Sequence, residues 1–164
     1  MKKLSFVTLI FVIFLYVSNG IQGQTTQLDQ VKLMKQMVGT WQANHGKDTV
    51  EVWECRQYGP QAFVIDVSWI IKGKKVPLYI NNIGFNPKEG KLKGFTLYTD
   101  GTYGTWIGAY TSETKSEGVL AQDFVPQLSW GKYETLLKNS KEYNWLFYNS
   151  NGVKTVDLQF VKVK

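Results

Sequence analysis

The side chains best suited to acid–base chemistry are rare in this chain, since His45 is the only histidine and Arg56 the only arginine. Both fall on the first predicted hairpin. Side chains alternate between the two faces of a strand, so His45 shares a face with Trp41 and Ala43. At the mouth of a cavity, the arginine would bind a carboxylate or sulfate and the histidine would transfer a proton. A histidine beside a turn is otherwise a surface residue, and that alternative stays open.

Tyrosines and tryptophans are a second source of function. A tyrosine near a cationic group acts as an acid or base in eliminations from sugar acids. Tryptophans supply large apolar walls for a ligand, although most of the six are expected in the core. The candidate catalytic residues are His45, Tyr98 and Tyr110. The candidate ligand-binding residues are Arg56, Trp69, Trp106 and Tyr79.

Familiar hydrolase and cofactor chemistries are disfavoured. The sequence has no zinc-protease motif, phosphate loop, nucleotide fingerprint or serine elbow. Its strand-embedded carboxylates do not have the spacing that identifies a glycosidase pair. Cys55 is the only cysteine, which excludes an internal disulfide and a cysteine-built metal site. We read Cys55 as a buried apolar residue rather than a nucleophile, and we predict neither cofactor nor metal.

Regular turn residues indicate the elements that position these side chains. Between the turns lie segments of about 8 to 12 residues rich in β-branched and aromatic types. Asp100-Gly101 and Asn151-Gly152 are typical of two-residue hairpins in which both residues have positive φ. Nine turns predict ten strands; they are His45-Gly46-Lys47, Tyr58-Gly59-Pro60, Lys72-Gly73-Lys74, Asn86 to Gly90, Asp100-Gly101, Ser112 to Lys115, Val125-Pro126, Lys138 to Lys141 and Asn151-Gly152.

Strict alternation of apolar residues supports antiparallel strands. Phe63 to Ile71 places every second side chain, all apolar, on one face. No helix-length segment separates the strands, so the chain predicts an all-β, antiparallel meander. Closing the meander into a β-barrel of about eight to ten strands removes its exposed edges. A β-sandwich is the alternative.

One short N-terminal helix precedes the strands. Leu28, Val31, Met34 and Met37 recur at helical spacing, and Gly39 stands where the helix would end. Thr26 is the predicted N-cap, with Asp29 three residues later. We expect this helix to close one end of the barrel or to pack beside it.

The run Met37-Val38-Gly39-Thr40-Trp41 resembles the opening of lipocalin-like (calycin) barrels. In those proteins the glycine allows close approach at the closed end and the tryptophan fills the barrel floor. The resemblance covers roughly Leu28 to Lys164 and implies a cavity inside the barrel. The second lipocalin motif is not evident. Nor does an arginine near the C-terminus cover the tryptophan, so a lysine such as Lys154 or Lys162 would have to replace it.

The N-terminus predicts export. Lys2 and Lys3 precede an apolar run from Leu4 to Val17, which is short for a membrane span. We expect a signal peptide over residues 1–23 and a barrel domain over 24–164, hence a periplasmic or secreted protein without a stable membrane anchor; an uncleaved anchor is the alternative. Loss of both lysines lowers the formal charge from +6 to +4, with no basic block for nucleic acid.

Two functions from different classes remain. The first is binding of a small hydrophobic or acidic amphipathic ligand in the barrel lumen, with Arg56 or a lysine facing an acidic head. The second is a cofactor-free lyase, dehydratase or cyclase acting on an acidic saccharide or small acid. The expected partner is therefore a small molecule or an oligosaccharide. Fold alone does not separate the two functions, because barrels host both.

Overall fold

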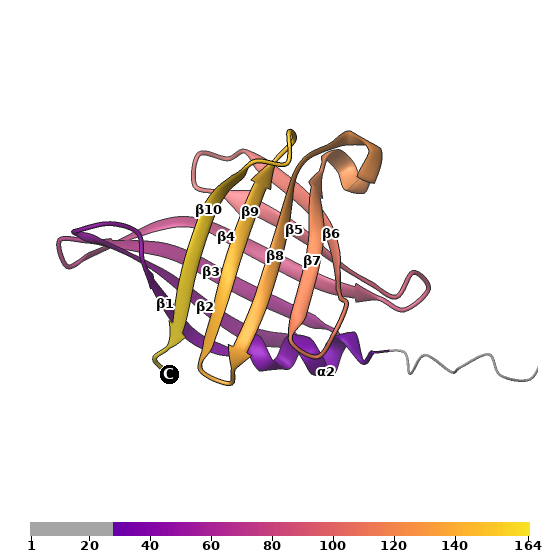
Figure 1. Cartoon of the computed structure of the whole chain (residues 1–164), viewed down its shortest axis with the longest axis horizontal. Coiled ribbons are helices and arrows are strands. Elements are labelled where there is room, and N and C mark those ends of the chain that lie inside the picture. Colours follow the sequence, from indigo (N-terminus) through magenta and orange to yellow (C-terminus); the bar gives the residue numbers. More distant parts are fainter. Residues whose placement is uncertain (1–27) are drawn as a thin grey trace, which may run out of the picture.

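The computed structural model describes residues 28–164, which form a closed antiparallel barrel preceded by one short helix (Figure 1). The predicted signal peptide and Thr26 lie outside the described residues. The helical elements are α2 (Gln30–Met34), η1 (Lys35–Met37), η2 (Gln122–Phe124) and η3 (Pro126–Leu128). The strands are β1 (Gly39–Asn44), β2 (Thr49–Gly59), β3 (Ala62–Ile71), β4 (Lys74–Asn86), β5 (Lys91–Tyr98), β6 (Tyr103–Tyr110), β7 (Lys115–Ala121), β8 (Ser129–Asn139), β9 (Glu142–Asn149) and β10 (Lys154–Lys162).

The topology is a simple meander. Over residues 28–164 each strand pairs with the next along the chain, and β1 pairs with β10 to close the barrel. All nine predicted turns fall at connections between consecutive strands. The all-β meander barrel is therefore confirmed, and the β-sandwich alternative is wrong.

The two predicted two-residue hairpins are wrong in detail. The β5–β6 connection runs over residues 99–102, and Gly101 has a positive φ of 86° while Asp100 does not. The Asp100 side chain instead accepts a hydrogen bond from the Thr102 backbone N–H at 2.9 Å, which favours a longer loop. The two-residue hairpin with both residues at positive φ is Lys72-Gly73, at 49° and 79°.

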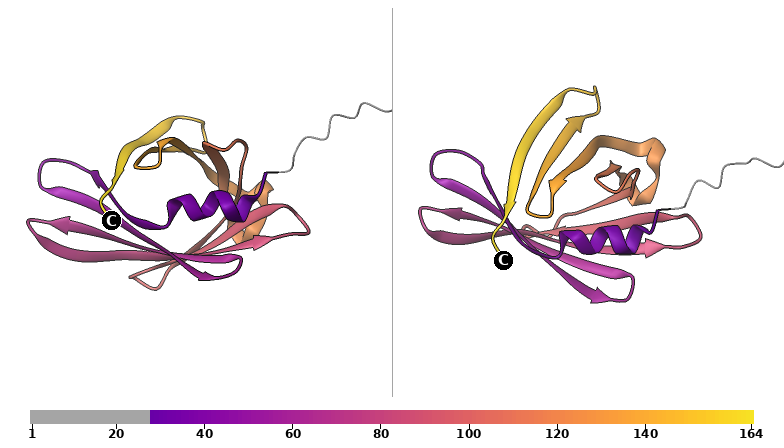
Figure 2. Two further views of the ribbon diagram at one scale, coloured as in Figure 1. Left: turned by 90° about the horizontal axis from the view of Figure 1, so that it is seen from below. Right: turned by 60° about the horizontal axis from the view of Figure 1, so that its bottom comes forward.

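The helix closes the lower end of the barrel, as Figure 2 shows in the view from below. Its N-cap is Asp29, whose side chain accepts from the Lys32 N–H, so the helix begins later than the Thr26 prediction implied. Gln30 fixes the helix to the barrel. Its amide nitrogen donates to the Tyr110 carbonyl at 3.1 Å, and its amide oxygen accepts from the Tyr110 N–H at 2.7 Å.

The barrel floor is built on the Gly-x-Trp motif. Trp41 is fully buried, and its indole N–H donates to the Met37 carbonyl at 2.7 Å. Gly39 has φ of +129°, and a side chain there would collide with the Lys164 carbonyl. The Lys162 amine lies 4.9 Å from the centre of the Trp41 ring, so this lysine covers the tryptophan.

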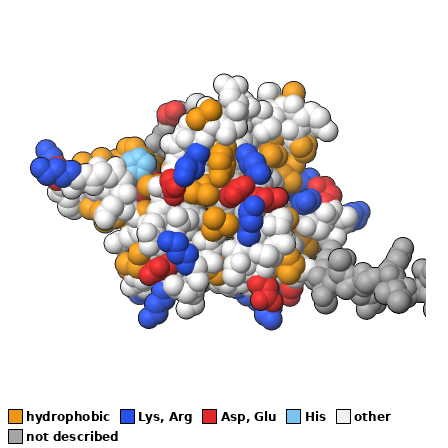
Figure 3. Space-filling view, in the orientation of Figure 1, with side chains coloured by type: hydrophobic (Ala, Val, Ile, Leu, Met, Phe, Trp, Pro, Cys, Tyr) orange, Lys and Arg blue, Asp and Glu red, His pale blue; other side chains and the backbone are white. Residues whose placement is uncertain are grey.

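The outer surface seen in Figure 3 mixes charges of both signs with isolated apolar side chains. Ion pairs contribute to this pattern, such as Lys115 to Glu117 at 3.0 Å along β7 and Lys132 to Glu134 at 3.2 Å along β8. Such surface pairs stabilise the fold only slightly, because solvent screens the two charges. Within residues 28–164, no helix has the length and apolarity needed to cross a membrane.

Candidate functional site: a cavity inside the barrel

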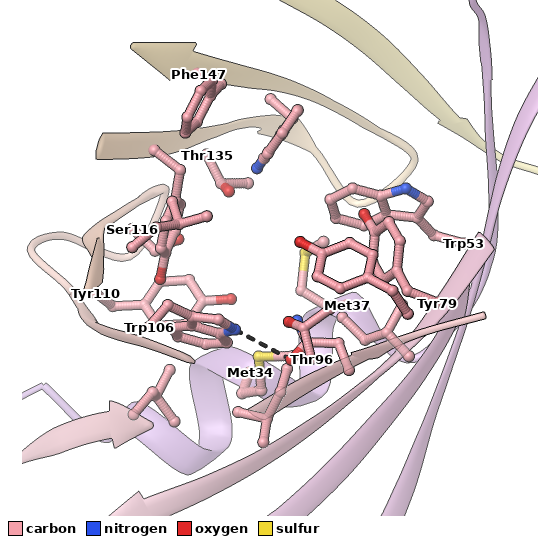
Figure 4. Close-up of a pocket in the computed structure, with 18 of the residues that line it drawn as sticks. Met34, Met37, Trp53, Tyr79, Thr96, Trp106, Tyr110, Ser116, Thr135 and Phe147 are labelled. Atoms are coloured by element: carbon pink, nitrogen blue, oxygen red, sulfur yellow. Dashed lines mark hydrogen bonds between the residues drawn. The ribbon is translucent and has the colours of Figure 1, made fainter. Parts of the chain in front are cut away.

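A cavity of about 310 Å³ lies inside the barrel, above the helix that closes its lower end. Figure 4 shows Met34 and Met37 at the helix side of this space, with Phe147 and Thr135 across from them. The volume is in the range of small-molecule sites. The residues that line it are Met34, Met37, Trp53, Ile65, Tyr79, Asn81, Ile83, Leu92, Thr96, Tyr98, Trp106, Tyr110, Ser116, Leu120, Trp130, Tyr133, Thr135, Trp145 and Phe147.

Glycines on the inner face explain why space remains among so many aromatic rings. The Trp106 ring lies over Gly94, and a Cβ atom there would overlap the ring. Likewise, a Cβ on Gly131 would overlap the Phe147 ring. A glycine beneath an aromatic ring lets that ring approach the backbone of the neighbouring strand. The rings therefore line the wall and leave the barrel centre open.

Tyr133 follows the same pattern on β6, β7 and β8. Gly108 pairs with Gly118, and Gly118 pairs with Tyr133 on the next strand. A Cβ atom on either glycine would overlap the Tyr133 side chain. Two successive glycines thus make room for one tyrosine, whose hydroxyl end reaches across β7 toward β6.

Polar groups gather on the β4–β5 part of the wall. Tyr79 pairs with Tyr98, and Asn81 pairs with Thr96 on the same face of these strands. All four side chains line the cavity. The Trp106 indole N–H donates to Asn81 Oδ1 at 3.0 Å, the bond drawn in Figure 4. This wall offers hydrogen bonds to a ligand without offering a full charge.

An aromatic series lines the opposite part of the wall, on β8 and β9, and continues to Trp53 on β2. Trp130 is 48% exposed and lies 6.0 Å from Phe147, measured between ring centres. Phe147 lies 6.1 Å from Trp145, which lies 5.6 Å from Trp53. The series therefore runs from an exposed ring into the barrel and gives a bound molecule a continuous apolar surface.

The cavity wall is uncharged at neutral pH. Within residues 28–164, no Lys, Arg, Asp, Glu or His lines the cavity. Burial raises the pKa of Tyr79, Tyr110 and Tyr133 well above the ordinary tyrosine value, so these hydroxyls stay protonated. Each hydroxyl then serves as a hydrogen-bond donor or acceptor and not as a resident base.

One buried carboxylate lies beside the cavity, on the inward face of β2, without being part of its lining. Glu51 is 6% exposed and accepts hydrogen bonds from Trp53 Nε1 at 2.7 Å and from Trp69 Nε1 at 3.4 Å. His45 Nδ1 lies 3.4 Å from Glu51 Oε2. The Glu51 charge also contributes to the raised pKa of Tyr79, after burial itself. Because Trp53 lines the cavity while holding Glu51, a negative charge lies close to this side of the site.

The structure brings some of the predicted site residues together and separates others. Those on the cavity wall are Tyr79, Tyr98, Trp106 and Tyr110. His45 and Trp69 instead contact each other near the β1–β2 hairpin, with ring centres 5.4 Å apart. Arg56 lies on the outer face, with its side chain 56% exposed and its Nε 3.6 Å from Asp66 Oδ2. His45 and Arg56 therefore do not meet in the cavity, and the functional roles of all seven residues stay predictions.

Strand register explains the position of Arg56. Gly39 pairs with Cys55, and Trp41 pairs with Trp53, so odd-numbered residues of β2 face inward. Arg56 has an even number, so its side chain points to the outer face. The same register turns Cys55 inward, where burial raises the pKa of its thiol to about 12. Cys55 is therefore a protonated thiol, and its burial is as predicted.

Sequence reasoning missed five polar residues at this site. Asn81, Thr96, Ser116 and Thr135 line the cavity, and buried Glu51 lies beside it. The alternation of inward and outward side chains along a strand would have indicated that each of them faces inward. Asn81 lies two residues from Tyr79 and two from buried Ile83, so it shares their inward face.

No protein-family model matches this chain, and comparison with curated proteins finds no match. The closed ten-strand antiparallel barrel over residues 28–164 is consistent with a calycin-like fold.

Proposed function

We propose that this protein binds a small, uncharged, mostly apolar molecule in the lumen of its barrel. The observation that carries the proposal is the cavity of about 310 Å³, whose wall over residues 28–164 combines aromatic and aliphatic side chains with neutral hydroxyl and amide groups. Such a wall gains free energy by removing apolar surface from water, while a few polar groups orient the ligand.

An acidic head group is not part of the proposal. Moving a carboxylate out of water has a large free-energy cost unless a cation receives it, and the part of the wall formed by residues 28–164 offers none. The Glu51 carboxylate behind Trp53 adds repulsion from the β2 side. The lyase alternative stays a prediction, and its candidate base, His45, is absent from the cavity wall.

Membership of the lipocalin-like barrels is part of this proposal. Three features support it: the Gly-x-Trp motif at the barrel floor, the helix across the adjoining end, and Lys162 over the Trp41 ring. Export is also part of it and rests on the apolar run from Leu4 to Val17. Cell fractionation followed by N-terminal sequencing tests this, and protein that stays in the cytoplasm with Met1 intact would overturn it.

Equilibrium dialysis against two matched three-ring probes tests the binding. Fluorene is neutral and apolar, whereas fluorene-9-carboxylate adds one negative charge to the same rings. We expect fluorene to bind with a dissociation constant in about the micromolar range, and the carboxylate to bind at least about tenfold more weakly, a free-energy difference of about 1.4 kcal/mol. Stronger binding of the carboxylate would contradict an uncharged ligand.

A pair of variants locates the binding. Thr135 faces the cavity, and Leu136, the next residue on β8, is 37% exposed. Thr135→Phe fills part of the cavity and should abolish or strongly weaken fluorene binding, while Leu136→Phe should leave it unchanged. Equal binding by the two variants would place the ligand outside the barrel.

A further inference from the structure

We propose that the cavity selects a ligand with a hydrogen-bond acceptor, such as a ketone or lactone carbonyl, which the side-chain amide of Asn81 recognises. This inference rests on the proposed function and specifies the chemical class of its ligand: a neutral ring compound with a carbonyl on one edge. The carbonyl would face the β4–β5 wall, and the apolar rings would lie against the aromatic series on β8 and β9.

The orientation of the Asn81 amide is fixed by chemistry. An indole N–H is a donor only, so the atom that it contacts must be an acceptor. Trp106 Nε1 lies 3.0 Å from Asn81 Oδ1, which therefore receives the indole proton. The amide nitrogen, with two donor hydrogens, is left for other partners. Among residues 28–164 it has none, although Asn81 lines the cavity.

Trp106 is itself held in place, so the Asn81 donor is positioned before any ligand arrives. The indole ring lies over Gly94, where a side chain would displace it. The Tyr133 ring contacts it edge-on, at 5.4 Å between centres. A donor fixed in advance costs less conformational entropy on binding than one that has to be ordered by the ligand.

The neighbouring polar groups do not impose the same choice. The hydroxyls of Tyr79, Thr96 and Tyr98 line the same wall, and each rotates to serve as donor or acceptor. They accommodate a carbonyl or an alcohol equally well. Asn81 differs from them because its oxygen already accepts the indole N–H, while its amide nitrogen has no partner among residues 28–164, so it favours an acceptor on the ligand.

The test compares 9-fluorenone, which has one ketone, with fluorene, which has the same rings without it. The ratio of their dissociation constants is measured by equilibrium dialysis for the unaltered protein and its variants. Comparing the ratio between variants cancels the difference in hydration of the two probes. We expect Asn81→Leu to lower the preference for fluorenone about three- to tenfold, the usual effect of one hydrogen bond.

Asn82→Leu is the matched control, because Asn82 is the next residue on β4 and is exposed on the outer face. It should leave the ratio unchanged. Asn81→Ala removes the amide without adding bulk and serves as a second variant whose folding is checked by circular dichroism. If both Asn81 variants bind fluorene normally and keep the fluorenone preference, the inference is wrong while the proposed function stands. If the unaltered protein binds neither probe, both are wrong.

Trp106→Phe tests the positioning role of the indole. The variant keeps an aromatic ring and the Asn81 side chain but removes the N–H that occupies Oδ1. The amide is then free to turn and present its oxygen. We therefore expect 9-hydroxyfluorene, which has a hydroxyl donor, to gain affinity relative to 9-fluorenone. An unchanged alcohol-to-ketone ratio would show that Trp106 does not set the orientation, and would overturn this part of the inference.

Discussion

The barrel floor and the cavity above it are built from the same residue types in opposite ways. At the floor, aromatic rings contact one another: Trp41 and Tyr143 have ring centres 4.8 Å apart, and Tyr143 and Phe160 are stacked at 4.9 Å. All three side chains are fully buried. In the cavity, aromatic rings lie over glycines of neighbouring strands instead, as Trp106 does over Gly94.

The difference shows that aromatic content alone does not determine whether a barrel is filled. A ring that contacts other rings fills the lumen, whereas a ring over a glycine lies against the wall. Close packing stabilises the floor, because its rings have contacts on all sides. The cavity walls gain less, because their side chains lack neighbours on the side that faces the empty space. The floor is therefore expected to carry stability, and the cavity to carry binding.

The largest expected effect is the loss of the floor tryptophan. Trp41→Ala removes a fully buried ring and its hydrogen bond to Met37, and should lower the free energy of unfolding by about 3 to 5 kcal/mol. Trp130→Ala is the control, since Trp130 is 48% exposed at the cavity, and should cost less than about 1 kcal/mol. Urea unfolding measures both. Equal decreases in the free energy of unfolding for the two variants would contradict the proposed difference between floor and cavity.

The next effect concerns the glycines beneath the rings. Gly94→Ala places a methyl group against the Trp106 ring and should destabilise the protein by about 1 to 3 kcal/mol. Gly84→Ala, on the adjacent strand β4, meets no atom within 4 Å and should change stability by less than about 0.5 kcal/mol. Thermal unfolding compares the two. A tolerated Gly94→Ala would mean that the Trp106 ring is not held against the wall.

Alkaline pH tests whether buried tyrosines stay protonated in both regions. Burial raises the pKa of Tyr79, Tyr133 and Tyr143 in the folded state, while the unfolded chain titrates near pH 10. The free energy of unfolding is therefore constant below about pH 10. Above it, the unfolded chain loses tyrosine protons that the folded protein keeps, so this free energy falls by about 1.4 kcal/mol per pH unit for each tyrosine. Urea unfolding between about pH 9 and pH 11 should show this slope. A phenolate absorbance change in the folded protein near pH 10 from Tyr79 or Tyr133, but not Tyr143, would show that water fills the cavity.

The smallest expected effect is a gain in stability. The Tyr143 hydroxyl is sealed in the floor and, within residues 28–164, has no hydrogen-bond partner. Tyr143→Phe should therefore stabilise the protein by about 1 kcal/mol at neutral pH, because an unpaired buried polar group is removed. Tyr133→Phe, whose hydroxyl lies at the cavity, should change stability little. A loss of stability in Tyr143→Phe would reveal a partner for its hydroxyl.

The sequence was sufficient to predict the strands and the floor. Turn residues and alternation located every strand connection, and the Gly-x-Trp motif identified Trp41 as the buried floor residue. The need for a lysine over this tryptophan was also foreseen, with Lys162 as one of two candidates. These features depend on the spacing of residues that are close together in the chain, which a single sequence shows.

The composition of the site was less predictable, because it depends on strand register. His45 directly follows β1 and Arg56 lies on the adjacent strand β2, yet the pairing of Gly39 with Cys55 turns Arg56 outward. A shift of one residue would have turned it inward. The Asn81–Trp106 bond joins strands that are not neighbours, since β5 lies between them. No spacing rule within one strand predicts such a contact.

The seam that closes the barrel has a consequence for how the chain folds. Over residues 28–164, every strand pairing joins neighbours in sequence except that of β1 with β10. Local hairpins form within microseconds, but this last pairing has to close a loop that spans almost the whole domain. The seam is short, with Cα partners Trp41–Lys162 and Gln42–Val161. We therefore expect its closure to be the late, slow step of folding, and its amides to exchange with solvent before those of the long β3–β4 pair.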